Sequence, residues 1–254
     1  MNRNTVTQYK SSGNLTKRIS IHEKYSTNEQ PFGHWIREHY ELRPGFRILE
    51  LGCGTGDMWN GSADLLPPDA LLILSDFSTG MLETAKANLG THPQLDYQVM
   101  DIQSIPMPDA SFDAVIANMM LYHVPDLRKG LSEVRRVLKP GGKFYCATYG
   151  EHGIMEFIND TLRHQGIHGE IGKTFTLQNG AAHLHKFFDS VEIDTREDSL
   201  AVTDVSDFVD YVLSLSSLTG IAESNREDLF DAFQRKTTNG ILYVPKEYGM
   251  FICK

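Results

Sequence analysis

A turn with three glycines is the part of this sequence best suited to hold a ligand. Residues 48–57 read Ile-Leu-Glu-Leu-Gly-Cys-Gly-Thr-Gly-Asp, so a short apolar run ends in a turn that contains Gly52, Gly54 and Gly56. Glycine adopts positive φ without strain and lets a ligand approach the backbone closely. The amides that open a helix after such a turn can also receive a polar group. The segment therefore indicates a binding turn, although its glycines alone do not identify the ligand.

Two acids near this turn narrow the choice of ligand. The glycine spacing is GxGxG rather than the GxGxxG of dinucleotide sites, and no Lys follows Gly56 as the Walker pattern requires. A carboxylate at Glu50, just before the turn, would repel a pyrophosphate but attract a cationic group. Asp76 lies 20 residues beyond Gly56, where an acid accepts two hydrogen bonds from a ribose diol. Together the residues predict a nucleoside that carries a positively charged, non-phosphate group.

Alternating strands and helices must position these residues. Short apolar runs predict strands, and helical periodicity between them predicts helices. The expected strands cover residues 46–51, 71–74, 95–100, 112–117 and 143–148, and the expected helices cover 55–66, 78–89 and 127–138. This alternation predicts an α/β fold with a parallel sheet that is covered on both faces.

The pattern is less regular outside this central part. Two short helices are expected within residues 15–40, and further helices over 151–165, 177–188, 204–215 and 224–235. Strand-like runs cover 190–195, 241–244 and 249–253. We predict a flexible N-terminus (1–14) and a single domain (15–254) made of a helical cover (15–44), a ligand-binding half (45–150) and substrate-side insertions with the last strands (151–254).

Composition excludes some classes of function. The chain has 254 residues, 41% of them hydrophobic, and a formal net charge of −9, so it has no global basic footprint for nucleic acid. Cys53, Cys146 and Cys253 form no CxxC pair, which argues against a disulfide framework or a cysteine zinc site. No apolar run reaches the ~18–20 residues that span a bilayer, and the polar N-terminus does not look like a secretory signal. We therefore expect a cytoplasmic protein that binds neither nucleic acid nor membrane, and either a monomer or a homodimer.

Several motifs in register resemble the class I S-adenosylmethionine-dependent methyltransferases. Residues 50–56 look like the first motif of that family, and the similarity continues through 76–78, 101–102, 112–115, Asn118 and 138–142. It covers roughly residues 45–150 and is closest to the small-molecule, quinone-biosynthesis-like branch (methyltransferase types 11 and 25). The resemblance implies a Rossmann-like, doubly wound, seven-stranded sheet that is mostly parallel with an antiparallel last strand. N-terminal helices and helical insertions would form a lid.

The resemblance also implies roles for individual residues. The glycine turn would pass under the methionine part of S-adenosylmethionine, and Glu50 would face its ammonium group. Asp76 would accept from the ribose, Phe77 would lie against the adenine, and Asp101 would accept from the adenine amino group. The expected cofactor contacts are Tyr25, Glu50, Gly52, Cys53, Gly54, Gly56, Asp76, Phe77, Met81, Asp101, Ile102, Asn118 and Met119.

Structural roles are open for several of these residues. Cys53 suits a small buried filler, and Phe77 and Ile102 are also typical core residues. Asp101 also suits a helix cap.

The acceptor side is less specific. Tyr122, His123 and Asp126 follow the fourth expected strand, at the carboxyl edge where α/β sheets bind ligands. Tyr122 and His123 are the catalytic candidates, because an imidazole has a suitable pKa to take a proton from a hydroxyl or amine. Alignment of the two reactants can also suffice. Residues 150–189 and 196–240 would form the acceptor wall or lid.

Trp35 and two histidines are further candidates for contact with the cofactor or for metal binding. Trp35 is a candidate cofactor contact but suits helix packing better. His164 and His168 have a metal-binding spacing, yet Gly166 and Gly169 weaken a helix there, so we expect no metal.

Four functions remain open at this stage. We favour a methyltransferase that transfers a methyl group to an oxygen, nitrogen or carbon of a small molecule and releases S-adenosylhomocysteine. The alternatives are a methyltransferase acting on RNA or protein, a nicotinamide-dependent Rossmann reductase, and a binding protein without catalysis. Acidity argues against RNA, and the GxGxG spacing without a Tyr-x-x-x-Lys pair argues against the reductase.

Overall fold

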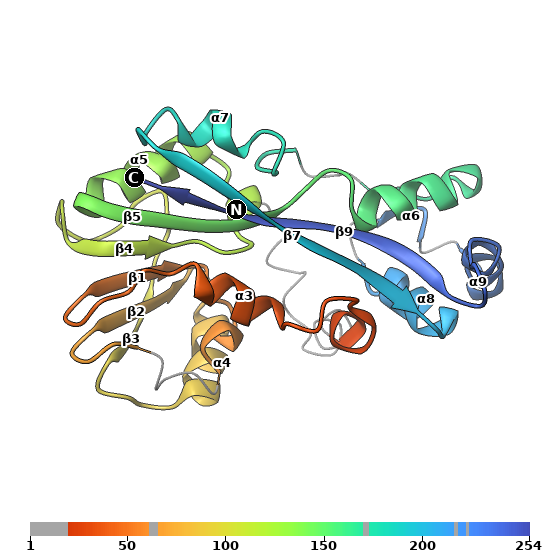
Figure 1. Cartoon of the computed structure of the whole chain (residues 1–254), viewed down its shortest axis with the longest axis horizontal. Coiled ribbons are helices and arrows are strands. Elements are labelled where there is room, and N and C mark those ends of the chain that lie inside the picture. The colour runs from red at the N-terminus through yellow and green to blue at the C-terminus, as the bar shows by residue number, and fades with distance from the viewer. Residues whose placement is uncertain (1–19, 61–65, 170–172, 216–217, 222–223) are drawn as a thin grey trace.

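The computed structural model describes residues 20–60, 66–169, 173–215, 218–221 and 224–254. The N-terminal segment 1–14, predicted to be flexible, lies outside these residues. Figure 1 shows an elongated molecule with a central sheet at one end and a smaller group of helices at the other. Within the described part, no helix is long and apolar enough to cross a bilayer.

A seven-stranded sheet forms the centre of the fold, with strand order β3-β2-β1-β4-β5-β9-β7. The strands from β1 to β5 pair in parallel, and β9 runs antiparallel to both of its neighbours, β5 and β7. This arrangement confirms the predicted mostly parallel, doubly wound fold with an antiparallel last strand. The strands are β1 (Arg47–Leu51), β2 (Leu71–Asp76), β3 (Leu95–Val99), β4 (Phe112–Ile116), β5 (Leu138–Tyr149), β7 (Val191–Val202) and β9 (Leu242–Cys253).

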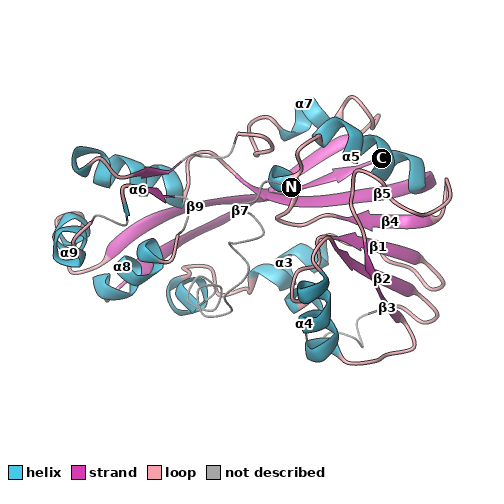
Figure 2. Cartoon of the chain, turned by 180° about the vertical axis from the view of Figure 1, so that it is seen from behind, coloured by secondary structure: helices cyan, strands magenta, loops and turns pink. Residues whose placement is uncertain are grey.

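Helices cover both faces of this sheet. In Figure 2, α5 and α7 lie on one side of it, and α3 and α4 on the other. The helices are α3 (Phe32–Glu38), α4 (Thr79–Leu89), α5 (Leu127–Val137), α6 (Ile154–Leu162), α7 (Gly180–Leu184), α8 (Val205–Leu213) and α9 (Arg226–Gln234), with 3-10 turns η1 (Asp57–Trp59), η3 (Leu121–His123) and η4 (Arg163–Gln165). Residues 20–25 are also helical, and β6 (His168–Gly169) pairs with β8 (Leu218–Thr219).

Local sequence explains where the central helices begin. Ser78 caps α4 by accepting from the Met81 amide, and Asp126 caps α5 by accepting from the Lys129 amide. Each cap gives an otherwise unpaired amide a partner, which favours Ser and Asp at these positions. The two helices therefore start directly after the carboxyl edge of the sheet, where the candidate site residues lie.

The last two long strands extend well beyond the rest of the sheet. β9 pairs with β5 only over residues 248–253, whereas it pairs with β7 over its whole length. Helices α6, α8 and α9 pack around the free end of this ribbon, and their buried apolar residues form a cluster of their own. We call these helices, together with residues 198–202 and 242–246, the outer lobe.

Several sequence-based boundaries were wrong. The strand expected at 190–195 continues to Val202, so the insertion expected from residue 196 begins only after that residue. The runs 241–244 and 249–253 are parts of one strand, β9. The helix expected over 55–66 is only the 3-10 turn η1 where it is described, and residues 61–65 lie outside the description. The part of β7 after Thr195 contains polar residues that are not typical of strands, so the sequence did not predict it. Its strand conformation depends on pairing with β9, which a single sequence does not reveal.

Candidate functional site

The glycine turn follows β1, and each of its glycines has a positive φ: +68° at Gly52, +57° at Gly54 and +77° at Gly56. A Cβ on Gly52 would lie 2.9 Å from the Cβ of Met120, and one on Gly56 would lie 2.8 Å from Cδ1 of Leu89. A Cβ on Gly54 would meet nothing within 4 Å. Two of the glycines thus allow close packing, whereas Gly54 borders open space into which a ligand fits.

Asp76 ends β2 beside this turn and holds it in place. Its Oδ2 accepts from the Gly54 amide at 3.0 Å, and its Oδ1 accepts from the Ser78 amide at 2.8 Å. Because an ionised carboxylate has about four acceptor sites, it can take further hydrogen bonds from a diol. The next residue, Phe77, is 49% exposed and therefore presents an aromatic ring outside the core.

Glu50 is a buried acid directly before the turn, with 3% of its surface exposed. Desolvation raises the pKa of Glu50 to about 7, the Trp59 hydrogen bond opposes that rise, and the charge of Asp76 adds to it. Its carboxyl accepts from the indole Nε1 of Trp59. Within the described residues, no salt bridge is recorded for Glu50. The environment therefore suits a cationic ligand group, which would restore the ionised form.

Asn118 lies after β4 on the same face of the sheet as Glu50. Its Oδ1 accepts from the Ala147 amide at 3.1 Å, and its Nδ2 donates to the Tyr40 hydroxyl at 2.6 Å. Next to it, Met119 has a φ of +52°, which is uncommon for a residue with a side chain. Such backbone conformations cluster at functional sites. Here the strained residue stands at the carboxyl end of β4, beside the expected methionine end of the ligand.

The described structure gives Cys53 and Met81 positions at the edge of the turn. Cys53 is half-buried, its amide donates to Ser75, and burial raises the pKa of its thiol well above the usual range. A protonated thiol is a poor nucleophile, in agreement with a filler role. Met81 lies in the first turn of α4, where its amide donates to Ser78.

Ile102 has the core position considered for it, whereas no helix begins at Asp101, so the alternative role of this residue as a helix cap was wrong. Asp101 accepts from both the backbone amide (2.9 Å) and the side-chain amide (3.1 Å) of Gln103, so it stabilises a local turn. Ile102 is 5% exposed and packs in the core, where Gly130 of α5 approaches its side chain closely. These contacts leave their predicted roles toward an adenine as proposals.

Tyr122 and His123 lie on η3, between β4 and α5. The centroids of their rings are 4.4 Å apart, and the ring of Tyr122 also lies 4.6 Å from that of Tyr149 at the end of β5. Burial lowers the pKa of His123, which favours the neutral imidazole that can accept a proton. Asp126 lies at the N-terminus of α5 and caps this helix, because its Oδ1 accepts from the Lys129 amide.

Tyr25, predicted to touch the cofactor, makes its recorded contacts elsewhere. Its hydroxyl donates to Asp207 of α8 at 2.6 Å, the ammonium of Lys24 lies 5.0 Å from its ring centroid, and the side chain packs in the cluster of the outer lobe. The structure therefore does not bring Tyr25 to the glycine turn. Trp35 packs on Phe32 and His39, as expected for a helix face.

The histidine-rich segment gives no sign of a metal centre. His152 pairs with Glu156, and His168 contacts the carbonyl of Gly166 at 3.3 Å. Among the described residues, no three His, Cys, Asp or Glu side chains are grouped closely enough to hold a metal ion.

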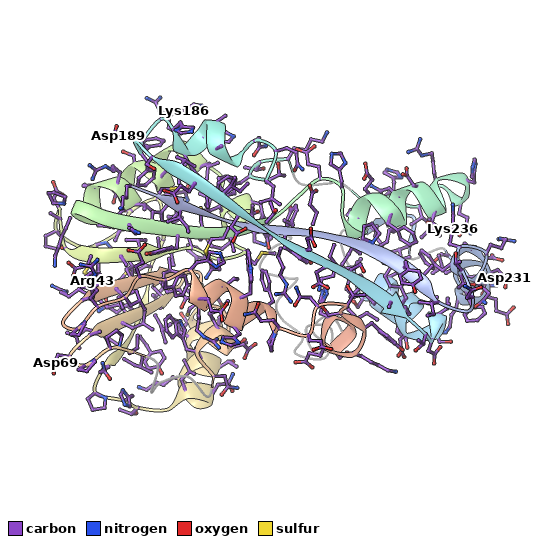
Figure 3. All side chains as sticks on the ribbon, viewed as in Figure 1. Arg43, Asp69, Lys186, Asp189, Asp231 and Lys236 are labelled. Atoms are coloured by element: carbon purple, nitrogen blue, oxygen red, sulfur yellow. The ribbon has the colours of Figure 1, made fainter. Side chains whose placement is uncertain are left out.

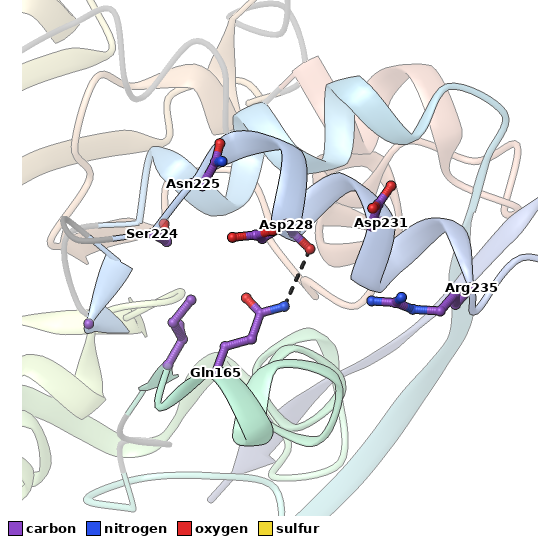
Figure 4. A pocket seen from close by; sticks show the side chains of 8 residues that line it. Gln165, Ser224, Asn225, Asp228, Asp231 and Arg235 are labelled. Atoms are coloured by element: carbon purple, nitrogen blue, oxygen red, sulfur yellow. Dashed lines mark hydrogen bonds between the residues drawn. The ribbon is translucent and has the colours of Figure 1, made fainter.

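A separate pocket of about 520 Å³ lies in the outer lobe, between η4 and α9. Figure 4 shows Gln165 reaching across it to donate to the carbonyl of Asp228 at 3.3 Å. None of the predicted site residues lines this pocket.

Two side chains near the turn were not singled out from sequence. Trp59 bonds to Glu50, and Tyr40 bonds to Asn118 and lies 6.2 Å from Trp59, measured between ring centroids. The sequence signal that could have identified Trp59 is its position nine residues after Glu50, where its indole can donate to that buried acid. No sequence signal places Tyr40, because it reaches the site from the N-terminal cover through space.

Comparisons with known proteins show similarity to methyltransferases. Residues 49–146 match the methyltransferase domain family. A demethylmenaquinone methyltransferase of Symbiobacterium thermophilum is 36% identical over 137 residues, which are 50% of this chain and 55% of that protein. The chain thus spans about half the length of the curated relatives it matches.

Solved structures show the same fold. The YcgJ protein of Bacillus subtilis superposes with a TM-score of 0.60 at 18% identity, over 87% of this chain and 95% of that one. A Haemonchus contortus phosphoethanolamine N-methyltransferase 2, in complex with phosphomonomethylethanolamine and S-adenosylhomocysteine, gives a TM-score of 0.60 at 19% identity, over 97% of this chain and 58% of that one.

Proposed function

We propose that this protein transfers a methyl group from S-adenosylmethionine to a small molecule, because residues 49–146 match the methyltransferase domain family. One observation supports the proposal most strongly. The carboxylate of Asp76 accepts from the amide of Gly54, the glycine of the turn that borders open space, and this supports a role for Asp76 in accepting hydrogen bonds from a ribose diol.

The residues fit each part of this cofactor. Glu50 offers a buried carboxylate to the ammonium group, Asp76 has free acceptor sites for the ribose hydroxyls, and exposed Phe77 offers a face to the adenine. Gly54 leaves room for the backbone of the turn to lie against the methionine part. Met81, Asp101, Ile102, Asn118 and Met119 complete the proposed contacts.

The chemistry needs few protein groups. The bound sulfonium supplies an activated methyl group, which an acceptor atom takes while the sulfur keeps the electron pair of the broken bond. The protein must align the acceptor, and alignment alone can lower the barrier by ~7–11 kcal/mol. His123, held neutral by burial, would take the proton that an oxygen or nitrogen acceptor loses, and the Tyr122 ring would border the acceptor.

A small-molecule acceptor fits better than RNA or protein. The net charge of −9 disfavours a polyanionic acceptor such as RNA. The curated relative from Symbiobacterium thermophilum acts on demethylmenaquinone by name, so a quinol-like carbon acceptor belongs in the first screen. Three free cysteines suit a reducing compartment, and we propose a cytoplasmic location.

Titration calorimetry with S-adenosylhomocysteine tests the proposal. We expect binding to the unaltered protein and at least a tenfold loss in Asp76→Ala. Asp96→Ala is the matched control, because Asp96 lies on the neighbouring strand β3 and bonds only to Tyr97 and Gln98. Tight NADH binding without S-adenosylhomocysteine binding would contradict the proposal. A methyl-transfer screen over phenols, quinols, amines and carboxylates then identifies the acceptor.

A further inference from the structure

One face of the sheet links the proposed methyl-transfer site to the base of the outer lobe. Strand alternation places Glu50 of β1 and Asn118 after β4 on this face. The same face continues through Tyr149 of β5, which pairs with Tyr248 of β9, and Tyr248 pairs in turn with Arg196 of β7. Glu50 aligns across the sheet with Tyr145 of β5, and Tyr149 lies four residues further along the same strand. A row of side chains on one face therefore leads from Glu50 along β5 to Tyr149 and then across β9 to Arg196.

Aromatic rings occupy the middle of this row. Tyr149 lies against Tyr122, with 4.6 Å between their centroids, and Phe32 of α3 lies 5.3 Å from Tyr248. These rings offer an apolar path between the proposed acceptor residue Tyr122 and Arg196.

Charged side chains are buried at the outer end of the row. The exposed fractions of the side chains are 2% for Arg196, 4% for Lys246 and 0% for Asp198. Lys246 and Asp198 form an ion pair, and Nε of Arg196 lies 3.6 Å from Oδ2 of Asp198. Two buried cations thus share one carboxylate, which leaves one positive charge uncompensated within this cluster. In contrast, Arg43 and Lys186 are exposed at the surface of the end that holds the central sheet (Figure 3).

The guanidinium of Arg196 is also only partly hydrogen-bonded. Its Nη2 donates to the carbonyl of Gln30, but its Nε and Nη1 have no hydrogen-bond partner in the described structure. The Nδ1 atom of His22 is likewise buried without a partner, and its ring lies 6.4 Å from that of Tyr248. Burial and the charge of Lys246 lower the pKa of His22 to about 4, against a smaller opposing effect of Asp198, so His22 is neutral at pH 7. An unpaired buried guanidinium is costly, and an anion would relieve that cost.

We propose that Arg196 and Lys246 bind a carboxylate or phosphate group of the methyl acceptor. The proposal rests on the proposed methyltransferase function and adds a substrate class: an acceptor with an anionic group at one end and its reacting atom toward Asn118 and Tyr122. The segment 22–30 covers this centre through hydrogen bonds from Ser26 and Asn28 to Asp198.

The test uses the full chain saturated with S-adenosylhomocysteine, with inorganic phosphate and acetate as separate probes in calorimetry and thermal unfolding. We expect at least one of them to bind and to raise the melting temperature. Arg196→Met should weaken that binding at least tenfold. Arg226→Met is the matched control, because Arg226 lies in the outer lobe but pairs with Asp210 at the surface. Which probe binds separates a phosphate from a carboxylate acceptor.

A second variant guards against a purely structural effect. Asp198→Asn removes the single carboxylate of the cluster, so it should strengthen anion binding, which a packing role would not produce. S-adenosylhomocysteine binding is measured on every variant and reports the proposed function separately. If the unaltered protein binds this cofactor product but neither anion, or if Arg196→Met binds the anion unchanged, the anion subsite is wrong and the proposed function stands. If the cofactor product itself does not bind, the proposed function fails.

Discussion

Burial of the Glu50 carboxyl lowers the stability of the free protein as the pH rises. Its carboxyl is buried with an indole donor but without a cation, and its pKa therefore lies at about 7 instead of near 4.5. Between these two values the folded chain holds a proton that the unfolded chain releases. The free energy of unfolding consequently falls as the pH rises through this window, and the loss persists above pH 7.

Replacing Glu50 by Gln should therefore stabilise the free protein at alkaline pH. Glutamine keeps an acceptor for Trp59 but carries no charge, so the gain at pH 8 is on the order of 1–3 kcal/mol, or several degrees in melting temperature. At pH 4 both side chains are neutral, and the difference should vanish. The same variant should bind S-adenosylhomocysteine at least tenfold more weakly. Thermal scans at the two pH values check the first part, and an equal shift at both would contradict the assignment.

The glycines of the turn allow a matched test of ligand contact. Gly54 and Gly45 both have positive φ, +57° and +74°, and a Cβ at either would meet nothing within 4 Å. Alanine should cost about 1 kcal/mol of stability at each position because of the backbone conformation alone. Only Gly54→Ala should also weaken S-adenosylhomocysteine binding, by tenfold or more in calorimetry. Equal affinities of the two variants would show that Gly54 does not line the ligand.

Residue-level prediction from sequence worked where a motif fixes position along the chain. The turn and the acids at the ends of β1 and β2 are adjacent because parallel strands bring their carboxyl ends to one edge. Tyr25 was misplaced because its partner, Asp207, is 182 residues away in sequence. Contacts of that kind depend on tertiary packing and leave no periodic signal.

At the scale of elements, the sequence predicted where several helices begin, but it did not predict long-range strand pairing. Ser78, Asp126 and Asp204 all stand where a helix begins and accept from amides of its first turn. The extension of β7 over residues 196–202 contains a buried Arg and Asp, which single-sequence patterns treat as loop residues. Its strand conformation follows from pairing with β9, which extends over all twelve residues of β7.

Asp126 should act on the stability of α5 and not on ligand affinity. Asp126→Ala removes the acceptor for the Lys129 amide and should cost about 1 kcal/mol, seen as a fall in melting temperature. Asp126→Asn should recover most of that loss, because Asn is an equally good cap. Affinity for S-adenosylhomocysteine should stay unchanged in both variants, and a selective fall in affinity would instead give Asp126 a role in binding.

At the scale of the whole molecule, the core of the outer lobe and the core of the central sheet are two separate bodies. Both include residues of the same two strands, β7 and β9. The cluster of the outer lobe packs on residues 200–202 and 242–244, whereas the clusters around the central sheet contain the inner halves of the same strands. The buried charges of Arg196, Lys246 and Asp198 lie at the inner edge of the outer lobe, just beyond the last residue of β9 that pairs with β5. An acceptor held there would touch both bodies, so its affinity depends on their relative placement.

This division predicts that the outer lobe can open without the central sheet. Phe233 of α9 and Phe112 of β4 are both fully buried, in the outer-lobe cluster and in a central cluster respectively. Alanine at either position should cost ~3–5 kcal/mol locally. In Phe233→Ala, hydrogen exchange should accelerate in α8 and α9, while β1–β4 and the affinity for S-adenosylhomocysteine stay unchanged.

Phe112→Ala is the matched control and should give the reverse pattern. Exchange in β1 and β4 should accelerate and the affinity should fall, because β4 pairs with β1 directly beneath the glycine turn. If both variants accelerate hydrogen exchange equally along the whole chain, the molecule unfolds as one unit. In that case the β7–β9 pair couples the stability of the outer lobe to that of the central sheet. Separate responses would mean that the acceptor end can loosen while the cofactor stays bound, which gives the acceptor a way in.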